Sequence, residues 1–168
     1  MIWVTGDIHG DPSRLSSRSF DEQEFFEKQD EIFLIILGDF GLVWNREKEN
    51  SHEKWWLNWL EDKPFTTLFI DGNHENYDRL DKYPVSEWNG GKVHFIRPHV
   101  IHLMRGQVFN IQGKTFFTFG GAASHDIRDG ILEMSDGRIF YWNRLGKEYR
   151  INHLTWWGKR NGFQRGNG

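Results

Sequence analysis

The sequence predicts one α/β domain in which two β-sheets pack against each other and helices flank them. Three short apolar runs, at 2–5, 32–37 and 67–70, alternate with segments of helical pattern, which favours a parallel sheet. After residue 94 the pattern changes to short strands separated by Gly-containing turns, which is typical of an antiparallel meander. A chain of 168 residues is long enough for one such domain and too short to expect two.

The first elements of the chain are a strand, a helix and a second strand. Residues 2–5 form a short β-branched and aromatic run, so we expect a strand there. Ser19 begins a helix with capping-box spacing, and this helix ends near Gln29. The run 32–37 is apolar without alternation, as expected for a central strand that is covered on both faces.

A second helix is expected between Ser51, which could cap it, and Pro64, which stops it. Its apolar face is predicted to consist of four residues: Trp55, Trp56, Trp59 and Leu60. We interpret the tryptophans as core packing rather than as a platform for a ligand. The third strand, 67–70, follows this helix.

The second half of the chain is predicted to form the second sheet. Its strands are expected at 94–96, 100–103, 108–111 and 115–119, and turns separate the last three into a meander. The glycine-rich segment 120–124 allows a close approach of the backbone, either to the first sheet, which we favour, or to a ligand.

The end of the chain gives a weaker pattern. Residues 126–157 show no clear period, and 158–168 is rich in Gly and basic residues, so we expect a disordered tail after a domain that spans 1–157. The segment 138–168 carries seven Lys/Arg against the single acid Glu148, so it bears +6 and the rest of the chain −9. Such a basic segment is either a nucleic-acid contact or, as we favour, solvated surface.

Composition restricts the chemistry that the protein can use. There is no cysteine, so disulfides and thiolate metal ligands are excluded, and any metal is held by oxygen and imidazole. Neither a signal sequence nor an apolar run of membrane-spanning length is present. We therefore expect a cytoplasmic protein without a membrane partner.

Polar side chains follow each strand of the expected parallel sheet. Asp7 and His9 follow the first strand, Asp39 the second, and Asn73 and His74 the third. Asp7 and His9 can face one point, because side chains two apart in an extended segment point the same way. Ligands of open parallel sheets bind outside the carboxyl ends of the strands. Oxygen and imidazole ligands without sulfur suit Mn, Fe or Zn.

Three motifs carry a family resemblance. Gly6-Asp7-Ile8-His9, Gly38-Asp39 and Gly72-Asn73-His74-Glu75, in this order and each behind a strand, resemble the calcineurin-like metallophosphoesterase superfamily. The resemblance runs from Met1 to about Ala123. It implies two mixed β-sheets sandwiched between helices, a calcineurin-like αββα sandwich. It also implies hydrolysis of a phosphate-ester substrate by a metal-activated water at a dinuclear site.

The resemblance assigns a role to each motif residue. It implies that Asp7 and His9 bind the first metal, that Asp39 bridges two metals and that Asn73 binds the second. His74 is implied to assist catalysis without binding metal, as an acid or as a group that stabilises phosphoryl charge. For Glu75 two alternatives stay open, orientation of a metal ligand and a plain solvated acid.

The sequence departs from the family pattern after these motifs. A further isolated His and a Gly-His-x-His pair are not recognisable, since none of the later histidines follows Gly or has that spacing: His94, His99, His102, His125 and His153. Only Asp39 and Asn73 would then hold the second metal, so we expect that site to be empty.

Three explanations fit this departure. We favour a C-terminally truncated member whose site is incomplete. Alternatively, His125 or a partner chain supplies ligands, or the protein is a non-catalytic binder of a phospho-ligand, a protein or nucleic acid. A truncated member could also be inactive, without a function of its own. Truncation would uncover apolar sheet surface and promote self-association.

Overall fold

The computed structural model describes residues 1–16, 31–120 and 125–156. The strands of these ranges are β1 (Ile2–Thr5), β2 (Phe33–Leu37), β3 (Thr66–Ile70), β4 (Val85–Trp88), β5 (Gly91–Arg97), β6 (Val100–Leu103), β7 (Val108–Ile111), β8 (Lys114–Phe117), β9 (Gly130–Leu132) and β10 (Tyr149–Ile151). The helices are α1 (Ser51–Glu61), α2 (Tyr77–Leu80) and α3 (Arg138–Arg144), with short 3-10 helices at Pro12–Leu15 and His125–Ile127.

A six-stranded mixed sheet is the centre of the molecule, with strand order β1-β2-β3-β6-β5-β4. β1, β2, β3 and β6 run parallel, whereas β5 and β4 are antiparallel to their neighbours. The carboxyl ends of β1, β2 and β3 therefore lie at one edge of the sheet. The predicted α/β fold class and the three predicted parallel strands are confirmed, with strand bounds that differ by no more than one residue.

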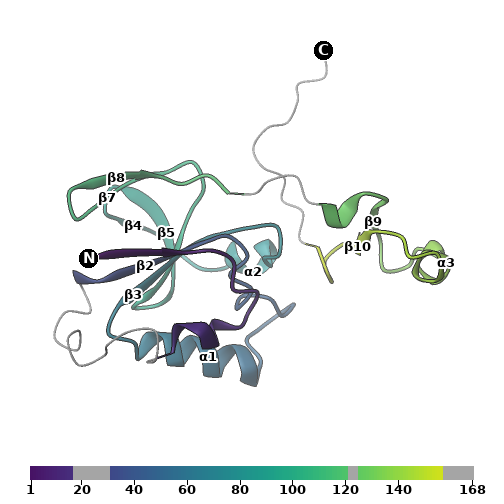
Figure 1. Ribbon diagram of the computed structural model, residues 1–168, viewed down its shortest axis with the longest axis horizontal. Helices are drawn as coiled ribbons and strands as arrows, with labels where there is room; N and C mark the ends of the chain where they lie inside the picture. Colours follow the sequence, from purple (N-terminus) through teal and green to yellow (C-terminus); the bar gives the residue numbers. More distant parts are fainter. Residues whose placement is uncertain (17–30, 121–124, 157–168) are drawn as a thin grey trace, which may run out of the picture.

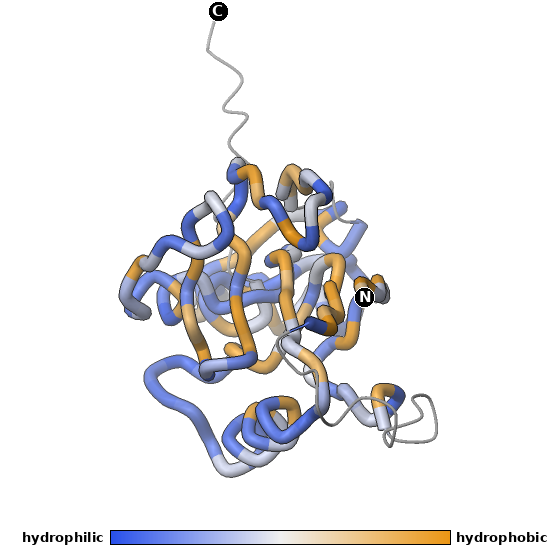
Figure 2. Tube along the Cα trace, turned by 90° about the vertical axis from the view of Figure 1, so that its left-hand side faces the viewer, coloured by the Kyte–Doolittle hydropathy of each residue, from blue (hydrophilic) through white to orange (hydrophobic). Residues whose placement is uncertain are grey.

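The two faces of this sheet pack against different elements, as β2 illustrates. Leu34 and Ile36 point into the cluster that α1 covers, while Phe33 and Ile35 point into the cluster that β7 covers. Figure 1 shows α1 on one side of the sheet and the β7–β8 hairpin on the other. Apolar residues accordingly concentrate in the central strands in Figure 2. A continuous apolar run is required because both faces of β2 are covered.

Helix α1 differs from the prediction in its cap and in its buried face. Asn50, rather than Ser51, is the N-cap, and its side chain accepts a hydrogen bond from the first turn. Trp55 is 57% exposed, so its assignment to the apolar face was wrong. Leu60, a predicted member of that face, is fully buried together with Leu57, because their three-residue spacing places both toward the sheet.

The strands at 94–96 and 100–103 were predicted to belong to the second sheet, and this was wrong. They lie in β5 and β6 of the central sheet, where β6 pairs with β3 and β5, and of the predicted meander only the β7–β8 hairpin forms. All four residues of β6 are buried, as expected for an interior strand. Among the described residues, the second sheet that packs on the central sheet is thus the two-stranded β7–β8 hairpin.

The β7–β8 hairpin buries one face and exposes the other. Phe109 and Ile111 of β7 are fully buried against the sheet. Val108 is 52% exposed, Phe117 64% and Phe119 57%. Within the described ranges β8 pairs only with β7. An open strand edge beside exposed aromatic side chains favours pairing with another chain.

We expect this hairpin to cause concentration-dependent self-association. The double substitution of Phe117 and Phe119 by Ser should shift the protein toward monomer in sedimentation velocity, because it removes the apolar surface without touching the core. Phe140→Ser is a matched control, since Phe140 on α3 is 59% exposed. A protein that is monomeric at every concentration, or an equal shift in the control, contradicts this prediction.

The segment 125–156 forms a separate lobe beside the sheet, visible around α3 and β9–β10 in Figure 1. His153 pairs with Asp78 at 2.7 Å, and Arg46 donates to the carbonyl of His153 at 3.2 Å. Several basic residues of the lobe pair with nearby acids: Arg138 with Asp136, Lys147 with Asp129 and Arg150 with Asp126.

Some predictions concern residues outside the described ranges. The helix expected from Ser19 to Gln29 and the tail expected at 158–168 belong to this group. In the described parts of the chain, no helix has the length and apolar character needed to cross a bilayer.

Candidate metal centre

The structure brings together three of the predicted site residues. Ligand atoms of Asp7, His9 and Asp39 all lie within 4.8 Å of one another. The side chains of His9 and Asp7 are 58% and 49% exposed, whereas that of Asp39 is 10% exposed. Among the described residues, this is the group of acids and imidazoles that could hold a metal ion.

Backbone hydrogen bonds lock the loops after β1 and β2 to each other. The amide of His9 donates to the carbonyl of Asp39 at 2.8 Å, and the amide of Gly10 donates to the carbonyl of Phe40 at 2.9 Å. His9 has φ 47° and Asp39 has φ 34°, a left-handed conformation that is costly for residues with a side chain. The same backbone region is adopted by Asn89, Gln112 and His153, so the two residues are notable for their place beside each other at the sheet edge rather than for the strain alone.

Gly72 is required for the position of Asp39. A Cβ atom on Gly72 would lie 1.9 Å from Oδ1 of Asp39 and 2.4 Å from its backbone nitrogen. No side chain fits between them, so only glycine allows the loop after β3 to approach this closely. The amide of His74 then donates to Oδ1 of Asp39 at 2.9 Å and orients the carboxylate.

Asn73 lies in the chain between Gly72, which abuts Asp39, and His74, whose amide donates to Asp39. Its side-chain Nδ2 is buried and has no hydrogen-bond partner among the described residues. A buried N–H donor without a partner is costly, and this one would pair with an acceptor such as a water or phosphate oxygen. The atom of Asn73 that could hold a metal ion is Oδ1, so the ligand role that the resemblance implies for Asn73 remains a prediction.

Glu75 is fully buried, which excludes the alternative of a plain solvated acid. Its carboxylate accepts hydrogen bonds from the amides of Phe40, at 2.5 Å, and Gly41, at 3.2 Å. Burial raises the pKa of Glu75 well above its usual range, despite these hydrogen bonds. Glu75 therefore fixes the backbone directly after Asp39 and acts on the cluster through that loop.

His74 pairs with an acid that the sequence did not indicate. Its Nε2 lies 2.9 Å from Oδ2 of Asp126, and Arg150 lies 3.0 Å from the same oxygen. Desolvation opposes the charge of Asp126, but the hydrogen bonds from His74 and Arg150 prevail and lower its pKa. Ionised Asp126 can only accept, so Nε2 of His74 donates and Nδ1 is left for another partner.

A hollow of about 170 Å³ lies beside this pair and is lined by four residues: His9, Gly41, Trp44 and His74. The rings of His9 and His74 are 5.6 Å apart, so the hollow adjoins both the cluster and the Asp126 pair. Sequence reasoning missed Asp126 and Trp44. Asp126 is 52 residues from His74 in a segment without a period, so no signal pointed to it.

The histidines that follow His74 in the described ranges lie outside the cluster of Asp7, His9 and Asp39. His94 and His102 are buried in the central sheet. His99 pairs with Glu61 at 2.9 Å, and His153 pairs with Asp78. His125 is not part of the cluster of Asp7, His9 and Asp39.

Arg14 contacts the first motif rather than a ligand. Its guanidinium donates to the carbonyl of Gly6 at 2.7 Å and also to that of Asp7. These contacts hold the loop that carries Asp7.

A parallel sheet that gathers carboxylates and imidazoles at its carboxyl edge defines an α/β protein with a candidate centre for divalent metal ions. The model of the calcineurin-like phosphoesterase family matches residues 1–166, so the chain belongs to that family. The family identification made from the three motifs is confirmed. Family members generally are phosphoesterases that bind divalent metal ions. No curated protein and no solved structure matches the chain.

Proposed function

We propose that this chain hydrolyses phosphate esters with the help of a divalent metal ion. The observation that carries the proposal is the cluster of Asp7, His9 and Asp39 beside the pair of His74 and Asp126. The cluster supplies ligands for a metal ion, and the pair supplies a proton donor. Both adjoin one hollow, so a phosphate ester there can meet both groups.

The residues present fit a divalent ion. Carboxylate oxygens and an imidazole suit Mn, Fe or Zn. Asp7, His9 and Asp39 would hold the first ion, and Asp39 and Asn73 the second. When bound, such ions polarise a phosphate ester and make water nucleophilic at neutral pH. Because Asn73 is neutral and has only Asp39 beside it, we expect the second position to bind weakly.

His74 is proposed to protonate the leaving oxygen of the ester. Its Nε2 donates to Asp126, which fixes the orientation of the ring. Nδ1 can then carry the proton that the leaving oxygen of the ester needs. Arg150 keeps Asp126 ionised and so maintains this arrangement.

Metal content and hydrolysis test the proposal together. Titration calorimetry with Mn²⁺ should show one tight site per chain, and p-nitrophenyl phosphate or its bis-ester should be hydrolysed only when metal is present. Chelation with EDTA should stop the reaction, and added Mn²⁺ should restore it. Absence of turnover with Mn²⁺, Fe²⁺ and Zn²⁺ in a folded protein that binds metal would reject the catalytic proposal.

His74→Asn should lower kcat by about 10²–10⁴-fold while Mn²⁺ affinity stays close to that of the unchanged protein. The proton donor is removed, but the backbone amide that orients Asp39 is kept. Steady-state kinetics and calorimetry on the same preparation measure the two quantities. His99→Asn is the matched control, since His99 also pairs with a carboxylate at 2.9 Å outside the site. Unchanged kcat in the His74 variant contradicts the assigned role.

A further inference from the structure

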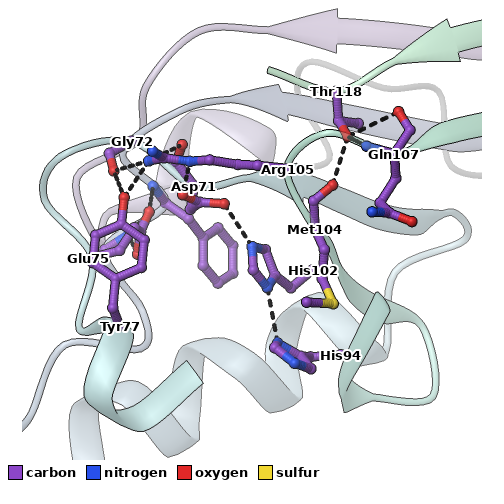
Figure 3. A network of polar contacts seen from close by, with 12 residues as sticks. Asp71, Gly72, Glu75, Tyr77, His94, His102, Met104, Arg105, Gln107 and Thr118 are labelled. Atoms are coloured by element: carbon purple, nitrogen blue, oxygen red, sulfur yellow. Dashed lines mark hydrogen bonds and ion pairs between the residues drawn. The ribbon is translucent and has the colours of Figure 1, made fainter. Parts of the chain in front are cut away.

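A network of buried polar groups lies directly beneath the third motif (Figure 3). Its centre is Arg105, which follows β6. Nη2 of Arg105 donates to the carbonyl of Gly72 at 3.0 Å and to that of Asp71 at 3.3 Å. It also contacts the hydroxyl of Tyr77, which itself donates to the carbonyl of Gly72.

These donors replace strand pairing. β3 ends at Ile70, so the carbonyls of Asp71 and Gly72 no longer belong to a strand of the sheet. Arg105 and Tyr77 therefore satisfy them at the point where the chain turns toward the site. Gly120 permits the approach, because a Cβ there would lie 2.3 Å from the carbonyl oxygen of Asp71 and 2.8 Å from Nε of Arg105.

Arg105 is itself held from the sheet interior. Its Nε forms an ion pair with the carboxylate of Asp71, which is 2% exposed. Nε2 of His102 lies 2.9 Å from the other oxygen of that carboxylate, and Nδ1 of His102 lies 3.1 Å from Nδ1 of His94. Two rings on neighbouring strands thus support one buried acid, and this acid fixes the guanidinium.

The protonation state of Asp71 determines which ring nitrogens of His102 and His94 carry a proton. Burial opposes the charge of Asp71, but the hydrogen bond of His102 and the charge of Arg105 lower its pKa, so the carboxylate accepts. Nε2 of His102 then donates, and its Nδ1 accepts from Nδ1 of His94 when both rings are neutral. Burial lowers the pKa of His94 to about 4, which agrees with a neutral ring there.

We propose that Arg105 is a positioning residue of the candidate metal centre, acting through the Gly72 carbonyl on the placement of Asn73 and His74. The inference rests on the proposed function for its effects on Mn²⁺ affinity and turnover, whereas its effect on the backbone at residues 72–76 is independent of that function. The Gly72 carbonyl that accepts from Arg105 belongs to the peptide bond between Gly72 and Asn73. The same glycine abuts Asp39, and the amide of His74 donates to the Asp39 carboxylate. A small error in the placement of reacting groups costs about 10²-fold in rate.

Arg105→Lys is the test. Lysine keeps the charge, but its single ammonium group cannot contact the Asp71 carboxylate and the Gly72 carbonyl at the same time in the way that the planar guanidinium does. Hydrogen exchange of the peptide that covers residues 72–76 should accelerate, and Mn²⁺ affinity should fall by about tenfold. In turnover assays, kcat should fall by about 10–100-fold with KM changed less than about twofold. The exchange and Mn²⁺ readouts remain decisive if the protein hydrolyses none of the esters.

Arg97→Lys is the matched control. The side chains of Arg97 and Arg105 are both 21% exposed, and both pair with a carboxylate, but Arg97 grips Glu49 away from the site. We expect no change in exchange at 72–76 or in Mn²⁺ affinity. If Arg105→Lys does not fold, Tyr77→Phe removes the second donor to the Gly72 carbonyl and should produce the same changes to a smaller extent. Unchanged exchange and Mn²⁺ affinity in the folded Arg105 or Tyr77 variant, or equal losses in the control, overturn the proposal.

Discussion

Asp39→Asn should abolish measurable Mn²⁺ binding and ester hydrolysis while the protein stays folded. Loss of a group that only orients a ligand costs about 10–100-fold in metal affinity, so loss of a charged ligand costs more than about a hundredfold. Asp39 has the largest effect of the three cluster residues, because it is the buried one and lies between the loops that carry His9 and Gly72. Asparagine keeps an oxygen that can accept from the amide of His74, so local structure is retained.

Titration calorimetry with Mn²⁺ and circular dichroism on the same sample measure binding and folding separately. Asp62→Asn is the matched control, since Asp62 is an exposed residue at the end of α1. It should bind Mn²⁺ like the unchanged protein. Mn²⁺ affinity retained in the Asp39 variant would remove this residue from the set of ligands.

Gly72→Ala should abolish the metal site without removing any ligand. The added methyl group would lie 1.9 Å from Oδ1 of Asp39, and the nearby backbone nitrogen of Asp39 prevents a simple shift. The carboxylate or one of the two loops must therefore move. Such overpacking costs about 1–3 kcal/mol of unfolding free energy. We expect Mn²⁺ affinity to fall by at least about a hundredfold, because displacement of a ligand exceeds loss of its support.

Gly6→Ala provides the control within the first motif. No atom lies within 4 Å of a Cβ at Gly6, so the substitution should leave both stability and Mn²⁺ affinity unchanged. Urea unfolding and Mn²⁺ titration of both variants decide the matter. A Gly72 variant that binds Mn²⁺ like the Gly6 variant would show that the contact between Gly72 and Asp39 has no importance for the site.

Part of the fold could be predicted because burial imposes a simple pattern. β2 is covered on both faces, so its apolar run was sufficient to identify it. The strand order could not be obtained in the same way. β6 is as buried as β2, but its partners are set by tertiary packing, and short turn-bounded strands look alike in a meander and in a mixed sheet.

The candidate site shows the same division. The strand-end rule placed Asp7, His9 and Asp39 at one edge, and the structure brings their ligand atoms together. Their roles as ligands remain predictions. The supporting residues were out of reach, because Asp126 and Arg105 reach the third motif from other elements and no local pattern links them to it.

The order of the elements along the chain has a consequence for biosynthesis. Ile2 pairs with Phe33 and Phe33 pairs with Thr66, so each strand of the cluster edge joins the one made just before it. Domains tend to fold from the N-terminus as the ribosome releases them. The candidate ligands Asp7, His9 and Asp39 can therefore gather on a nascent chain before Asp126 has been added. His74 acquires its partner Asp126 last, so the cluster can form before the pair.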